Sequence, residues 1–282
     1  MAMKYQMLRE GMVSTAKGYV KSSTLIYQIA SRYSRIAHQF SANIELLYNC
    51  LTQTAIVSPF ALIYASPDKI THLSDADFET IPSLHQRYSP IVSGDWDRNK
   101  WPLREYDLYS SIVAHFEEDI PWERTDFYNR VQNNMESGDF GRKWGVTTLE
   151  EFKERISHLD ELYTEMVTDR YKTQRELRYS NDDPIERHRS HRNSHFYPPE
   201  LHEITVHIDR NGEMLLHDGR HRLAIAQAAG LERIPVRIMA RHSSWQEVRE
   251  RVAASRSVDQ LEHNIRVQLH HPDLIALLSN ET

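Results

Sequence analysis

Apolar residues recur at helical spacing near the start of the chain. The pattern comprises Leu25, Ile26, Ile29, Ile36, Phe40, Ile44 and Leu47. Such three- and four-residue spacing is typical of an amphipathic helix. We expect residues 1–56 to form a helical extension whose apolar face packs against the rest of the chain. Its first turns are basic, which leaves docking to a membrane surface or a partner as the alternative.

A short apolar run follows this extension. Residues 59–64 (PFALIY) suit a buried strand, and Ser66-Pro67-Asp68 then marks a turn. Residues 91–105 are rich in turn formers, so we expect a loop there. Two helices should follow, at about 103–118 and 122–136.

The next helix carries a clear start signal. Thr148, or Thr147 before it, precedes an acidic residue by three positions, which is the spacing of a capping box. Thr125 offers a simpler cap for the helix before. The apolar positions after Thr148 predict a helix over residues 148–168.

Residues 203–240 give the strongest pattern in the chain. Residues 203–208 alternate as a strand does, and Asn211-Gly212 is a strong hairpin signal before a return strand at 214–217. A helix should begin near Arg220 and stop at Gly230. A further strand at 234–239 and a helical tail complete the chain.

Composition excludes several classes of protein. Of 282 residues, 40% are hydrophobic and 26% are charged, which argues against wholesale disorder. Cys50 is the one cysteine, so the chain has neither an internal disulfide nor a cysteine zinc site. The longest apolar stretch is far below the ~20 residues of a transmembrane helix. Without a recognisable secretory signal, we expect a cytoplasmic protein.

Charge is distributed unevenly. The net charge is −6, but residues 171–256 hold 15 Lys and Arg against 12 Asp and Glu. This basic region suits an anionic small ligand or a local nucleic-acid contact, and ordinary surface charge is the alternative. Within it, residues 180–200 predict a long loop. The Arg187–Arg192 basic run could contact phosphates or simply be solvated, and the histidines there have no regular metal-ligand spacing.

The segment Asp218-Gly219-Arg220-His221-Arg222 joins the hairpin to the next helix. A glycine there allows close approach of the backbone to a ligand, and the helix start presents unpaired N–H groups. Cations in a first helical turn oppose the helix dipole, and a bound anion resolves that conflict. The pattern therefore indicates a phosphate site. Pairing of the arginines with local acids is the alternative.

The run LLHDGRHRLAIAQAAGLERIPVRIM, residues 215–239, resembles the signature of the ParB/sulfiredoxin superfamily. The resemblance is close over about 204–242 and looser over the 148–168 helix and the 60–64 strand. Uncharacterised prokaryotic ParB-like proteins, many of them archaeal, share GDWD and DGRHRLAIA with this chain. The resemblance implies an α+β fold. It consists of a small mixed sheet with packed helices, a helical insertion at about 96–145 and helical extensions over 1–56 and 243–282.

Each branch of the superfamily implies a different activity. Sulfiredoxins place a catalytic cysteine where this chain has Arg220, so reduction of a sulfinic acid is not expected. ParB proteins bind CTP phosphates through Gly-Glu-Arg-Arg, which Gly219, His221 and Arg222 match apart from the glutamate. Free-serine kinases carry Asp-Gly-His-His-Arg motifs, which are nearest to residues 218–222. The resemblance thus implies phosphate binding by Gly219, Arg220, His221 and Arg222.

Phosphoryl transfer also needs carboxylates and a metal ion. Gly94-Asp95-Trp96-Asp97 supplies two carboxylates, and Asp95 is our candidate base with Asp97 a candidate Mg²⁺ ligand. A turn anchored by a buried Trp96 is the alternative for this loop. Asp218 and His221 are further catalytic candidates.

Arg241, at the end of the last strand, is a third candidate phosphate contact. Thr173 or Gln174 could line a substrate pocket or lie on the surface.

We therefore expect a nucleotide-binding domain of the ParB/sulfiredoxin type. Its ligand would be a nucleoside triphosphate or diphosphate with Mg²⁺, and its reaction would be ATP- or ADP-dependent phosphoryl transfer to a small molecule. A regulatory module that binds nucleotide or DNA without catalysis is the alternative. Nuclease activity is less favoured, since it requires a metal cluster that the sequence does not assemble.

Overall fold

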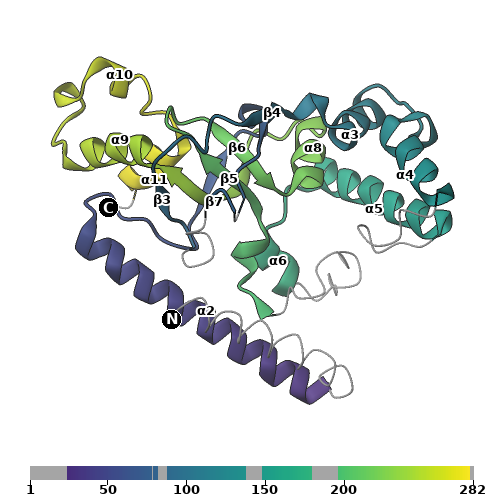
Figure 1. Ribbon diagram of the computed structural model, residues 1–282, viewed down its shortest axis with the longest axis horizontal. Helices are drawn as coiled ribbons and strands as arrows, with labels where there is room; N and C mark the ends of the chain where they lie inside the picture. The colour runs from purple at the N-terminus through teal and green to yellow at the C-terminus, as the bar shows by residue number, and fades with distance from the viewer. Residues whose placement is uncertain (1–23, 78, 82–87, 138–147, 180–195, 280–282) are drawn as a thin grey trace.

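The computed structural model describes residues 24–77, 79–81, 88–137, 148–179 and 196–279. This part of the chain is a mixed α/β structure with a central sheet and helices around it (Figure 1). The Arg187–Arg192 basic run and the histidines 188, 191 and 195 lie outside the described residues.

The sheet combines parallel and antiparallel pairs. Its strands are β1 (Leu62–Ala65), β2 (His72–Ser74), β3 (Ile91–Val92), β4 (Lys100–Pro102), β5 (Ile204–Ile208), β6 (Met214–Asp218) and β7 (Ile234–His242). They lie in the order β1-β7-β5-β6-β2-β4, and β3 pairs with the far end of β7. Strand β5 runs parallel to β7 and antiparallel to β6, so the predicted Asn-Gly hairpin is confirmed.

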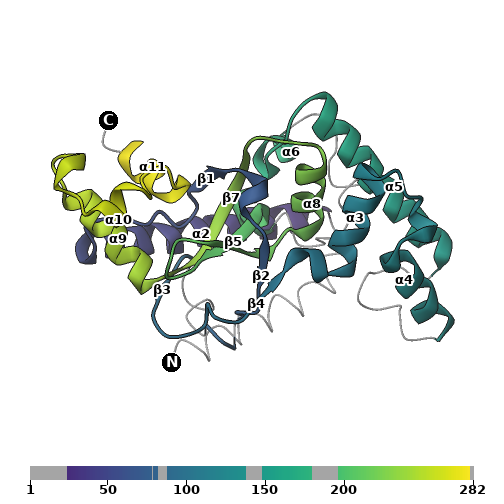
Figure 2. The ribbon, with the colours of Figure 1, turned by 90° about the horizontal axis from the view of Figure 1, so that it is seen from above.

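Helices flank the sheet on several sides. They are α2 (Thr24–Thr52), α3 (Asp107–Glu117), α4 (Asp126–Glu136), α5 (Leu149–Thr168), α6 (Gln174–Tyr179), α8 (Arg220–Ala228), α9 (Ser243–Ala254), α10 (His263–Arg266) and α11 (Pro272–Ser279). Helices α3, α4 and α5 gather at one end of the molecule and α9, α10 and α11 at the other (Figures 1 and 2). Helix α2 runs along one side.

Helix starts follow the predicted caps. The Thr125 side chain accepts a hydrogen bond from the Tyr128 backbone N–H at the start of α4. Thr148 and Glu151 form the capping box that begins α5. Each cap satisfies backbone donors that would otherwise be unpaired, which stabilises a helix end by about 1 kcal/mol.

The two faces of the sheet differ in character. On β5, Ile204, Val206 and Ile208 join the main hydrophobic core, which also takes in residues of α3, α5 and α8. The alternate residues Thr205 and His207 are equally buried but point to the other face, since side chains alternate along a strand. The tail after β7 belongs to the same core through side chains such as Trp245 and Leu274.

Two predictions of local structure need correction. Residues 91–105 are not all loop, because β3 and β4 form there by pairing with β7 and β2. The apolar face of the N-terminal helix does not pack against the chain: Phe40 is 66% exposed and Leu47 62%. Within the described part of the chain, no helix has the length and apolar character that crossing a membrane requires.

Candidate functional site

Gly219 shapes the junction between β6 and α8. It is the N-cap of α8 and has φ +93°, a left-handed conformation that glycine adopts without strain. A Cβ at this position would lie 3.0 Å from the Ile204 Cα, so a side chain would press on the neighbouring strand. Among the described residues no side chain caps this helix start. The first N–H groups of α8 therefore lack the usual local acceptor.

Arg220 lies in the first turn of α8 and contacts a neutral group. Its Nη1 donates a hydrogen bond to the Tyr106 hydroxyl at 2.8 Å, and its guanidinium lies 5.1 Å from the centre of the Tyr106 ring. Both contacts orient the guanidinium without cancelling its charge.

Arg222 lies close to a buried carboxylate. It donates to the Tyr171 hydroxyl at 3.1 Å and to the His202 carbonyl, and it lies 3.5 Å from a Glu203 carboxylate oxygen. Glu203 is 2% exposed, and burial raises the pKa of its carboxyl. The geometry therefore favours pairing of Arg222 with the Glu203 carboxylate over a free phosphate-binding role.

Positive charges near the start of α8 act on the His221 ring. Burial is the largest cause that lowers the pKa of its ring, to about 4, and the charges of Arg155, Arg220 and Arg222 lower it further. Asp218 acts in the opposite direction. The ring is therefore neutral at pH 7, beside three guanidinium groups and one exposed carboxylate.

Asp218 faces solvent at the end of β6. Its carboxylate accepts a hydrogen bond from the Gly219 N–H at 2.7 Å. This contact fits the turn-forming role that we considered for it. The carboxylate also lies near the His221 ring, and a joint catalytic role for Asp218 and His221 requires this proximity.

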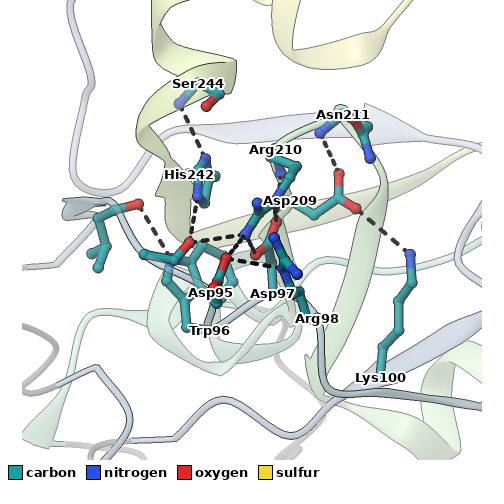
Figure 3. Close-up of polar contacts among 12 residues, drawn as sticks. Asp95, Trp96, Asp97, Arg98, Lys100, Asp209, Arg210, Asn211, His242 and Ser244 are labelled. Atoms are coloured by element: carbon teal, nitrogen blue, oxygen red, sulfur yellow. Dashed lines mark hydrogen bonds and ion pairs between the residues drawn. The ribbon is translucent and has the colours of Figure 1, made fainter.

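The second predicted group, Asp95 and Asp97, is held by an arginine from the hairpin turn (Figure 3). Arg210 donates to Asp97 through its backbone N–H at 3.0 Å and through Nε at 2.8 Å, and to Asp95 at 2.8 Å. Asp97 is 3% exposed, and burial alone would raise the pKa of its carboxyl. The hydrogen bonds from Arg210 outweigh this effect and lower the pKa to about 2.

Asp95 is a poor candidate for a base. Its carboxylate contacts both Arg210 and Arg98, and the hydrogen bond from Arg210 is the main cause that lowers its pKa. A carboxylate stabilised in its ionised form accepts a proton less readily. Trp96 beside it is buried and donates to the Val92 carbonyl, as the alternative of a turn anchored by this side chain predicts.

Arg241 is engaged in the interior. Its guanidinium forms two hydrogen bonds to Asp273, at 3.0 and 2.7 Å, and a third to the Ser89 hydroxyl. With 6% of its surface exposed, it anchors the start of α11 to β7 rather than facing a ligand.

The predicted site residues therefore form two groups. Asp95 and Asp97 lie at the turn of the β5–β6 hairpin, and Arg241 pairs with Ile208 at the same end of the sheet. Residues 218–222 follow the other end of β6. Strand β6 runs between the two groups, and its five residues from Met214 to Asp218 span about 13 Å. The structure does not bring the acidic pair to the phosphate motif.

A cavity of about 640 Å³ opens at the same end of the sheet as Gly219. Its walls include Tyr64 of β1, Tyr171, Thr173 and Arg233. This volume is in the range of small-molecule sites. Of the two alternatives for Thr173, the structure therefore supports a place in a pocket wall.

Sequence reasoning missed Arg155 and Tyr106, which bring charge and orientation to the start of α8. Arg155 lies on α5 between the buried Phe152 and Ile156, so a charge at an inward-facing position was the available signal. Burial lowers the pKa of its guanidinium. Tyr106 has no such signal, because its role depends on how α3 packs against α8.

No protein-family model, no curated protein and no solved structure matches this chain. Among the described residues no group of three or more His, Cys, Asp or Glu side chains is placed to hold a metal ion.

Proposed function

We propose that this protein binds the phosphate groups of a nucleotide at the start of α8. The proposal assigns the anion contacts to Arg220 and Arg155, with the Gly219 backbone providing close approach. Mg²⁺ would arrive bound to the nucleotide phosphates. The ParB/sulfiredoxin resemblance of residues 204–242 belongs to the same proposal.

The observation that carries the proposal is the convergence of guanidinium groups on an uncapped helix start. Arg155 from α5 and Arg220 and Arg222 from α8 all act on the His221 ring. Arg222 also lies 3.5 Å from the buried Glu203 carboxylate, whereas the described contacts of Arg220 are with the neutral Tyr106. Phosphate oxygens match guanidinium donors and accept hydrogen bonds from helix N-terminal N–H groups.

The proposal is limited to binding. The predicted phosphoryl transfer required Asp95 as a base and Asp97 as a metal ligand. Arg210 pairs with both carboxylates at the end of the β5–β6 hairpin opposite to Gly219. Asp218 is the carboxylate beside the motif, and the Gly219 N–H occupies one of its oxygens. A binding role therefore needs fewer assumptions than a kinase.

Isothermal titration of the full chain with ATP, ADP and inorganic pyrophosphate, with and without Mg²⁺, tests this function. Arg220→Gln should weaken binding about tenfold or more, because a hydrogen bond to a charged group contributes about 1.5–3 kcal/mol. The matched control is Arg251→Gln, an exposed arginine of α9 that pairs with Glu262. Equal affinities for both variants, or no binding by the wild type, would refute the proposal.

A further inference from the structure

Helix α2 packs against the protein through its polar face. Its buried residues are Ser31, His38, Ala42, Glu45 and Asn49. Asn49 donates to the Val57 carbonyl at 2.8 Å, and Glu45 accepts the Tyr88 backbone N–H at 2.9 Å. These contacts fix the orientation of the helix, so its opposite face points away from the protein.

That opposite face is apolar. Its residues are Ile29, Tyr33, Ile36, Phe40, Ile44, Leu47 and Leu51, which we call the α2 stripe, and they are 55–79% exposed. At about 100 Å² for each side chain the α2 stripe exposes roughly 700 Å². This exceeds the largest patch of many monomers and approaches the ~800 Å² that each partner buries in a stable interface.

The α2 stripe is symmetric about Phe40. Ile36 and Ile44 lie four residues to either side, Tyr33 and Leu47 seven, and Ile29 and Leu51 eleven. A two-fold axis at Phe40 would therefore place each apolar residue of one helix against an apolar residue of an antiparallel copy. Self-complementarity of this kind is what an isologous dimer requires.

We propose that two copies of this chain associate through antiparallel pairing of α2, with Phe40 at the two-fold axis. The stripe repeats every eleven residues, at Ile29, Phe40 and Leu51, and such a repeat gives a right-handed supercoil that keeps the apolar seam between two paired helices. Two such helices can stay in contact along the whole stripe.

A second copy explains the stripe better than a membrane does. Helices that lie on membranes keep a charged polar face in contact with headgroups and solvent. The polar face of α2 is instead covered by its own chain, through residues such as His38 and Asn49.

Sedimentation or light scattering of the full chain measures this association. The wild type should be a dimer at micromolar concentration, and Phe40→Glu, or Ile44→Glu as a second variant, should be a monomer with an unchanged circular dichroism spectrum. Val267→Glu is the matched control, because Val267 is 52% exposed outside α2 and its variant should stay dimeric.

Cys50 tests the direction of pairing. It is the one cysteine of the chain and is exposed on α2, so it takes a spin label without mutation. In the antiparallel pair each Cys50 lies ten residues from the two-fold axis, on opposite sides of it. The two labels should therefore be about 30 Å apart along the helices. A parallel pair would bring them to about 10 Å, the distance between packed helices.

Three results would overturn the proposal. One is a wild type that stays monomeric at about 100 micromolar. Such a monomer includes the case in which another segment of the same chain covers the α2 stripe. The second is a short distance between the Cys50 labels. The third is a monomer that binds phosphatidylserine vesicles and loses that binding in Phe40→Glu, which would assign the stripe to a membrane surface.

Discussion

At the residue scale, glycines with positive φ set the geometry at both ends of β6. Gly219, at φ +93°, starts α8 and brings its backbone against Ile204. Gly212, at φ +91°, closes the β5–β6 turn, and its Cα faces the Trp245 ring. The first determines access to the proposed phosphate site, and the second fixes how α9 packs on the hairpin.

Gly212→Ala should lower the free energy of unfolding by about 3 kcal/mol, because it combines overpacking with a left-handed backbone. A Cβ there would overlap the buried Trp245 ring. Gly230→Ala is the control, since φ is +66° and no atom lies within 4 Å of the added Cβ. Urea denaturation of both variants measures the difference, and equal losses would contradict the predicted overlap.

Buried histidines make stability depend on pH. Burial is the main cause that lowers the pKa of His207 to about 3 and that of His221 to about 4, below the ordinary 6.5. Between these values and 6.5 the unfolded chain binds more protons than the folded one. Stability is therefore complete above pH 6.5 and lost as the pH falls toward 4.

His207→Gln should make this loss shallower. Each histidine contributes up to about 1.4 kcal/mol per pH unit within the window. Unfolding by urea at pH 5 and pH 7 gives the two free energies for the variant and the wild type. If their difference is the same in both proteins, His207 is not a source of the pH dependence.

At the element scale, a buried ion cluster attaches α11 to β7 and α9. Asp273 is 1% exposed and accepts hydrogen bonds from Arg241 and, at 2.9 Å, from the Trp245 indole. It also forms an ion pair with Arg249, whose Nε lies 3.2 Å from its carboxylate. These arginines strongly lower the pKa of the Asp273 carboxyl, although burial opposes the shift. One carboxylate thus pairs with two buried guanidinium groups.

Asp273→Asn should destabilise the fold by about 3–5 kcal/mol, the range for breaking a buried pair, because it leaves two arginine charges uncompensated. Asp259→Asn, at an exposed position of the same tail, should change stability little. Thermal and urea unfolding would test this difference. Equal stability of the two variants would show that the arginines find other compensation.

Elements with strong local signals were predictable from the sequence. Thr125 and Thr148 accept hydrogen bonds from backbone N–H groups within three residues, and the Asn211-Gly212 turn reverses the chain direction within a few residues. The structure confirms all three predictions. Strands β3 and β4 were not predicted, because two or three residues become a strand only when β7 or β2 lies beside them.

The site was predictable only where it is local. Residues 218–222 are consecutive, so the strand, the glycine and the helix start follow from the sequence. The partner of Asp97 is Arg210, 113 positions away, and no spacing rule connects them. The sequence therefore could not show that the GDWD loop lies at the other end of the hairpin.

At the scale of the whole molecule, α2 shows why periodicity does not reveal burial. The helix carries an apolar row around Phe40 and a polar row through His38 and Asn49, both at helical spacing. The usual expectation buries the apolar row, and the structure buries the polar one. The α2 stripe is therefore left for a second copy, on the long helix at the side of the molecule (Figure 1).

The ring of His221 offers the most direct test of the phosphate site. A phosphate bound beside Arg155 and Arg220 would offset the charges that help to lower the His221 pKa. Nuclear magnetic resonance of histidine-labelled protein, with His221→Gln to assign the signal, follows its titration. Saturating ADP should raise the pKa from about 4 by about one unit or more, which corresponds to ~1.4 kcal/mol. An unchanged His221 titration at saturating ADP would contradict binding at the start of α8.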